Sequence, residues 1–277
     1  MIRFDPEEIE AARRGSRAAL ERVVRVAERP IYNLSLRMLA DRTDAEDATQ
    51  EILVKIVTHL GALREVGAAG GWALRIACRH LVDTRSRSRV EAMRLTFRGF
   101  AADLEDGLAP LAGAALEDAE AALAIEEVKI GCTLAMLTCL NREARIAYLL
   151  GDVFELSDRE AASVLEVGSG AYRQRLRRAR GAVRSFVAVR CGVVSADAAC
   201  RCENRVCTAI ARGRVLAGRS DFGLETAKRA DIEDLRAHVA QLEEGRRAAA
   251  LMRSNPDFLS RIGDLVWAVI DQQKVQV

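Results

Sequence analysis

Residues 157–190, SDREAASVLEVGSGAYRQRLRRARGAVRSFVAVR, predict two helices joined by a short turn. The first four residues, SDRE, form a capping-box pattern, in which serine and glutamate side chains bind free backbone amides at a helix start. A short apolar-periodic helix follows and ends near Leu165, and a long helix begins at about Ser169. Between them lies the three-residue turn Glu166-Val167-Gly168. Two helices around a short glycine-containing turn are typical of a helix-turn-helix.

The second helix of this hairpin has one apolar face and one strongly basic face. Tyr172, Leu176, Ala179 and Val183 follow one another at spacings of four, three and four, and we expect this face to be packed. From residue 169 to 190 the chain has seven arginines and no acid. Such a stripe is typical of a helix that binds the DNA major groove, because arginine and glutamine can make two hydrogen bonds to guanine and adenine.

These side chains are the candidate DNA-binding residues of the second helix. We predict base contacts for Arg173, Gln174 and Arg177, and mainly phosphate contacts for Arg175, Arg178 and Arg180. The alternative is a solvated basic face without a partner. Like charges at this spacing repel one another, which counts against that alternative.

Composition favours an all-α protein. The 277 residues are 50% hydrophobic and only 4% aromatic, with four prolines, and strong helix formers dominate. We expect helices over Ile9–Ala27, Ile31–Ala40 and Asp44–Leu60, the last opened by a capping box at 43–46. A further helix should run from about Trp72 to beyond Asp83.

The net charge of +2 hides a segregation of charge along the chain. Residues 101–127 carry eight acids and no base, and they could repel DNA, mimic it or simply be solvated. Gly107, Pro110 and Gly113 in this stretch indicate a linker over residues 99–120. We therefore expect two small helical domains at 1–98 and 121–190, followed by a helical C-terminal extension at 191–277. Its last helices should lie near Ile232–Leu242 and Phe258–Ile270.

The hairpin resembles the DNA-reading domain of extracytoplasmic-function sigma factors. Residues 162–176, ASVLEVGSGAYRQRL, align without gaps to that family's pattern A-x-x-L-G-V-S-x-G-T-V-K-S-R-L, and the R-A-R that follows is present at 178–180. Among the departures from the pattern, Glu166, Gly168, Ala171 and Tyr172 stand where Gly, Ser, Thr and Val are usual. The fold should survive these changes, but the family's promoter sequence cannot be transferred.

The N-terminal part resembles the same family independently. Residues 44–56, DAEDATQEILVKI, look like the helix that grips the polymerase clamp, and 72–77, WALRIA, with Asp83, look like the helix that opens the promoter. The resemblance implies a non-enzymatic factor whose partners are core RNA polymerase and promoter DNA. An anti-sigma factor is a possible further partner. It implies polymerase binding through Asp47, Gln50 and Glu51, and binding of single-stranded DNA through Arg75, Arg79 and His80.

Four cysteines lie close together after the basic helix. Cys191, Cys200, Cys202 and Cys207 could close a zinc site of four thiolates, although their spacing is not that of common zinc modules. A redox role or simple burial are the alternatives, and we expect no required cofactor. Cys78, Cys132 and Cys139 lie in apolar helices and should be core residues.

Several function classes are disfavoured. No apolar run is long enough for a membrane span, and the N-terminus lacks a signal core, so we expect a cytoplasmic protein. No phosphate-binding loop or His-Glu metal motif points to an enzyme or a metal-sensing adaptor. A helix-turn-helix regulator that works without polymerase explains the basic hairpin, but it leaves the segments 44–56 and 72–83 unexplained.

Overall fold

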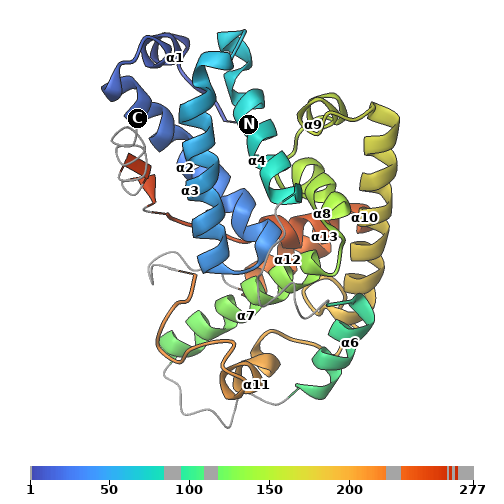
Figure 1. Cartoon of the computed structure of the whole chain (residues 1–277). Coiled ribbons are helices and arrows are strands. Elements are labelled where there is room, and N and C mark those ends of the chain that lie inside the picture. Colours follow the sequence, from blue (N-terminus) through green and yellow to red (C-terminus); the bar gives the residue numbers. More distant parts are fainter. Residues whose placement is uncertain are drawn as a thin grey trace. The chain divides into compact units, whose positions relative to one another are not determined.

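The computed structural model describes residues 2–83, 95–108, 118–222, 232–260, 262–263 and 266–267. Within these ranges every regular element is a helix, which confirms the all-α expectation (Figure 1). The chain forms two compact units, each made of several segments. The first contains Met1–Ala92, Leu149–Arg175 and Asp257–Val277, and the second contains Met93–Tyr148 and Leu176–Pro256. The domain boundaries expected from the sequence stay a prediction.

The first unit is built around one long helix, α2. Its elements are α1 (Pro6–Arg13), α2 (Arg17–Leu39), α3 (Arg42–His59), α4 (Ala69–Asp83) and α9 (Asp158–Val164). Helix α2 packs against α1, α3 and α4, and α4 also contacts α9. Buried aliphatic side chains such as Ile31 of α2, Ile52 of α3 and Leu81 of α4 form the core.

The expected break between the first two helices is wrong. Helix α2 continues through Pro30, and the break lies earlier, at Gly15, whose φ of +88° favours glycine. Ser16 then caps α2, its Oγ accepting a hydrogen bond from the Ala19 amide at 3.4 Å. Proline inside a helix costs about 3 kcal/mol, but nearly every residue from Ile31 to Leu39 is buried, and this packing outweighs the cost.

The cap of α3 also differs from the expected one. Asp41, not Thr43, is the N-cap, and its Oδ1 accepts a hydrogen bond from the Asp44 amide at 3.0 Å. Both residue types favour this position, and sequence alone does not choose between two candidates that lie two positions apart.

The second unit contains the remaining helices. They are α6 (Phe97–Asp106), α7 (Asp118–Thr138), α8 (Arg142–Tyr148), the larger part of α10 (Ser169–Arg190), α11 (Val206–Ala211), α12 (Ile232–Gln241) and α13 (Glu244–Arg253). A π-helical turn, Leu149–Val153, follows α8 along the chain and belongs to the first unit. Ala124 and Val128 of α7 share a small core with Val206, Ala209 and Val215.

Two stretches differ from the sequence expectation. Helix α6 occupies residues 97–106, and its residues 99–106 lie in the range expected to be a linker. The helix expected from Phe258 does not begin there, because residues 256–260 are not helical. Both backbone polar groups of Phe258 bind the Asn33 side chain instead: its amide donates to Oδ1 at 3.0 Å, and its carbonyl accepts from Nδ2 at 2.9 Å.

Candidate nucleic-acid interface

The predicted hairpin is present as α9 and the start of α10. Ser157 Oγ accepts from the Glu160 amide at 3.3 Å, and Glu160 Oε2 accepts from the Ser157 amide at 2.9 Å, so the predicted capping box is confirmed. In the turn, the Val167 amide donates to the Ala162 carbonyl at 3.0 Å. Glu166 has a φ of +54°, a left-handed conformation that suits the glycine usual at this position.

The two faces of α10 follow the predicted division. Tyr172, Leu176, Ala179 and Val183 are all buried. On the opposite side five of the six candidate DNA-binding residues are exposed: Arg173, Gln174, Arg177, Arg178 and Arg180. Arg175 is half-buried. The helix therefore presents a basic surface to solvent, and the division into base and phosphate contacts stays a prediction.

Helix α4 brings two further arginines to the turn of this hairpin. Arg79 Nη2 lies 2.5 Å from Glu166 Oε2, and Arg75 Nη1 lies 3.7 Å from Glu166 Oε1. The Arg79 side chain is exposed. The two arginines are one helical turn apart, so one carboxylate can bridge both of them.

His80 lies apart from these arginines, on the inner side of α4. It is buried, its Nδ1 is 2.7 Å from Lys55 Nζ, and its Nε2 is 3.8 Å from Glu51. Burial and the Lys55 ammonium lower the pKa of His80, which favours the neutral ring. A buried neutral imidazole is a weak ligand for a phosphate, so α4 presents Arg75 and Arg79 without it.

The outer face of α3 carries the three residues predicted to bind polymerase. Asp47 and Glu51 are exposed and Gln50 is half-buried, while Ala48, Ile52 and Ile56 are buried. Helix α3 is therefore amphipathic, with these three residues on its polar side. Its role in polymerase binding stays a prediction.

Two family models cover these same elements in the same order. Residues 23–90 match the Sigma-70 region 2 model, and residues 130–183 match the Sigma-70 region 4 model. Both matches are to Sigma-70 factors, and the chain is similar to their extracytoplasmic-function group. Region 2 thus holds α3 and α4 of this sigma factor, and region 4 holds the hairpin with the basic face of α10.

Curated relatives agree with this assignment. The sigma factor is 28% identical over 181 residues to the ECF RNA polymerase sigma factor SigE of Mycolicibacterium smegmatis, covering 63% of its own chain and 65% of the relative. It is 28% identical over 186 residues to the RNA polymerase sigma-H factor of Pseudomonas aeruginosa, covering 65% of its own chain and 91% of the relative. The match therefore spans less than two thirds of the length of the first relative.

The zinc site predicted at four cysteines of this sigma factor finds no support in the structure and stays a prediction. In the described part of the chain, no three or more Cys, His, Asp or Glu side chains are placed to hold a metal ion. Burial raises the pKa of the Cys200 thiol to about 11 and also raises that of Cys191 and Cys202. Zinc binds thiolate, so these thiols would have to lose their protons when a metal ion bound.

The cysteine that accompanies these three is Cys132 of α7. Its pKa is raised by burial and further by Cys191, Cys202 and Cys200, so these three cysteines lie near it. The Gly192 amide donates to the Cys200 carbonyl at 2.9 Å and closes the loop that carries them. Cys207, the fourth predicted ligand, lies on α11. Cys78 is buried, which confirms it as a core residue.

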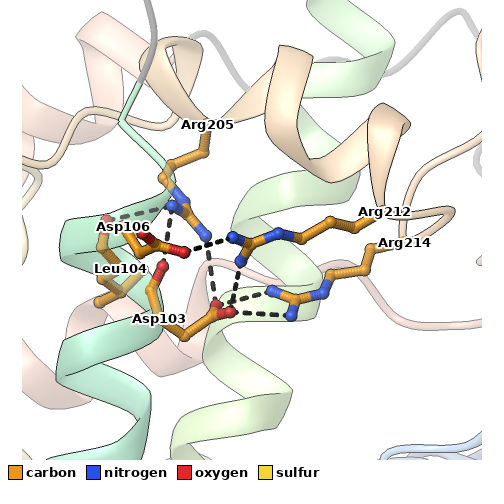
Figure 2. Close-up of polar contacts among 6 residues, drawn as sticks. All are labelled: Asp103, Leu104, Asp106, Arg205, Arg212 and Arg214. Atoms are coloured by element: carbon orange, nitrogen blue, oxygen red, sulfur yellow. Dashed lines mark hydrogen bonds and ion pairs between the residues drawn. The ribbon is translucent and has the colours of Figure 1, made fainter.

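Sequence reasoning missed one cluster entirely. Asp103 of α6 binds three arginines of the extension, Arg205, Arg212 and Arg214 (Figure 2). In the acidic stretch 101–127, Asp103 is therefore paired with arginines and not merely solvated. The only sequence signal was the complementary charge of two segments about a hundred residues apart.

No helix in the described residues is long and apolar enough to cross a membrane.

Proposed function

We propose that this sigma factor binds core RNA polymerase, recognises promoter DNA and so initiates transcription. The observation that carries the proposal is the pairing of the two matched regions with two exposed surfaces. Region 2 presents the polar face of α3, and region 4 presents the basic face of α10. A regulator that binds DNA without polymerase needs only the second of these surfaces.

The proposal divides DNA recognition between two helices. The N-terminal half of α10 enters the major groove, where Arg173, Gln174 and Arg177 contact bases. Arg75 and Arg79 of α4 provide positive charge for the single strand that forms when the promoter opens. Both arginines reach Glu166 in the structure, so DNA must replace that carboxylate. The exchange of one anion for another is favoured when the incoming strand carries many phosphates.

Polymerase binding is assigned to Asp47, Gln50 and Glu51 of α3. Their acidic and amide groups complement a basic partner surface. The sigma factor contributes no catalytic residue, because the polymerase performs the chemistry, and it acts where polymerase acts, in the cytoplasm. An anti-sigma partner is a further prediction of the family resemblance.

Zinc has no role in the proposal. No step of the proposed function depends on an ion at Cys191, Cys200, Cys202 and Cys207. Elemental analysis of protein purified without chelator tests this directly, since a zinc site of four thiolates would give about one zinc per chain.

The test of the proposal is capture of genomic DNA fragments with and without core polymerase. We expect sequence-specific capture only when core polymerase and this protein are both present, and capture should weaken as salt rises. Specific capture by the protein alone, unaffected by core polymerase, would instead support a helix-turn-helix regulator that acts without polymerase.

A further inference from the structure

Three arginines of the C-terminal extension bind one carboxylate of helix α6, that of Asp103. Arg214 binds Asp103 with two hydrogen bonds, Nη1 to Oδ2 at 2.6 Å and Nη2 to Oδ1 at 2.8 Å. Arg212 Nη1 binds Oδ1 at 2.6 Å, and Arg205 Nη2 binds Oδ2 at 3.3 Å. Figure 2 shows the three guanidinium groups converging on this one side chain. Paired hydrogen bonds between arginine and carboxylate are among the strongest polar contacts in proteins.

Arg205 also closes the C-terminal end of α6. Its Nη1 donates to the carbonyls of Asp103 at 3.2 Å and Leu104 at 3.0 Å. Carbonyls in the last turn of a helix lack partners within the helix, so this guanidinium satisfies them. The Arg205 side chain is only 7% exposed. A Cβ added at Gly107 would collide with it, so glycine makes room for the contact.

This cluster differs from an ordinary surface ion pair. Asp103 is mostly covered, and hydrogen bonds from Arg214 lower the pKa of its carboxyl group. Arg212 holds a second acid of the same helix, Asp106, at 2.8 Å. Several partners share one residue, so the side-chain entropy lost for each contact is smaller than for an isolated pair.

Helix α6 in turn packs on α10. The rings of Phe97 and Phe100 lie 5.2 and 5.4 Å from the ring of Phe186, centroid to centroid. Phe100 and Phe186 are buried. Glu105 pairs with Arg190 at the end of α10. These contacts hold α6 against the C-terminal half of α10 at two places.

We infer that Asp103 is a positioning residue for DNA recognition, through which the extension fixes α6 and α6 fixes the direction of α10. The inference rests on the proposed function, in which α10 reads the promoter. Phe186 lies thirteen positions after Arg173, or about 20 Å along the helix at 1.5 Å per residue. A tilt of about 10° at Phe186 would move Arg173 by roughly 3 Å, close to the spacing of successive bases in one strand.

Two variants break the cluster by different routes. Asp103→Asn removes the charge and keeps the size of the side chain. Gly107→Ala leaves every charge in place but displaces the Arg205 guanidinium. Their controls are Asp103→Glu, which keeps the carboxylate, and Gly99→Ala, whose added Cβ meets only Thr96 Oγ1 at 3.4 Å.

The physical readout is hydrogen exchange of the full-length protein, which does not depend on polymerase. In Asp103→Asn and Gly107→Ala, we expect exchange to rise about tenfold, a loss of about 1.4 kcal/mol of protection. The rise should occur in α6 and also in residues 172–178 of α10, while both controls stay within about twofold. A rise confined to α6 would overturn the inference, and so would no rise in either variant.

The functional readout is promoter affinity of the complex with core polymerase. Both breaking variants should lose about tenfold in specific binding, with unchanged affinity for core polymerase and unchanged salt dependence, because no phosphate contact is lost. Wild-type affinity in both variants would overturn the inference. Failure of the wild-type protein to bind promoters with polymerase would overturn the proposed function instead. Hydrogen exchange would still test the coupling of α6 to α10, because it does not depend on polymerase.

Discussion

Replacing Phe258 with alanine should strongly destabilise the first unit. Phe258 is only 2% exposed and lies against the Arg37 guanidinium, 5.0 Å from the ring centroid. Its backbone is held by Asn33, and four residues later the Ile262 amide donates to Glu28 Oε1 at 2.7 Å. The side chain therefore anchors the end of the chain on α2.

The magnitude follows from this burial. Removing a buried phenylalanine ring costs about 3–5 kcal/mol, and the loss of the cation–π contact contributes to the same figure. Burial lowers the pKa of Arg37 to about 10, so the cation persists at neutral pH. We expect a loss of about 4 kcal/mol. Leu259, the next residue, is 57% exposed, and Leu259→Ala should change stability by less than about 0.5 kcal/mol.

Intrinsic fluorescence in a urea titration measures this difference. The chain has two tryptophans, Trp72 and Trp267, and both lie in the first unit, so their emission reports on that unit. With a slope of about 2 kcal/mol per molar urea, the midpoint should fall by about 2 M in Phe258→Ala and by less than about 0.3 M in Leu259→Ala. Equal midpoints in the two variants would show that Phe258 does not anchor the segment.

Three further predictions concern the candidate interfaces and the Asp103 cluster. Arg173→Ala should cost about 1–3 kcal/mol of binding free energy on a specific promoter and relax specificity at one base position. Arg178→Ala should instead lower the affinity for all DNA sequences and reduce the slope of affinity against salt by about one. Equal, sequence-independent losses in a salt titration would refute the division into base and phosphate contacts. Reversing charge at Asp47 and Glu51 together should reduce co-purification with core polymerase without changing helical content by circular dichroism, and undiminished capture would exclude α3 from that interface. The pKa of Asp103 is lowered from 3.8 in the folded protein. The stability advantage of wild type over Asp103→Asn should therefore be complete above about pH 5 and disappear only as pH falls below 3.8. An advantage that is already lost at pH 5 would contradict the ion pairs of Asp103 with its arginines.

The features that could be predicted from the sequence are those fixed by nearby residues. The capping box at Ser157 and the apolar face from Tyr172 to Val183 depend on spacings of three and four residues, and both are confirmed. The continuation of α2 through Pro30 was missed because burial of the residues after Pro30 outweighs the local cost of proline.

The features that could not be predicted depend on distant partners. Asp103 meets Arg205 across 102 positions, and Asn33 meets Phe258 across 225. Charge pattern shows that a segment is acidic, but it does not show which basic segment will contact it. The cysteines illustrate the converse, because proximity in sequence suggested Cys207 as a ligand, whereas Cys132, from a distant helix, interacts with the other three.

Initiation of transcription itself provides the decisive measurement. Run-off transcription is carried out on genomic DNA fragments with purified core polymerase, with and without this protein. We expect discrete transcripts only when both proteins are present, and their yield should fall when Asp47 and Glu51 are reversed in charge. DNA fragments bound specifically by the protein alone, with no transcript in the presence of core polymerase, would contradict its proposed role as a sigma factor.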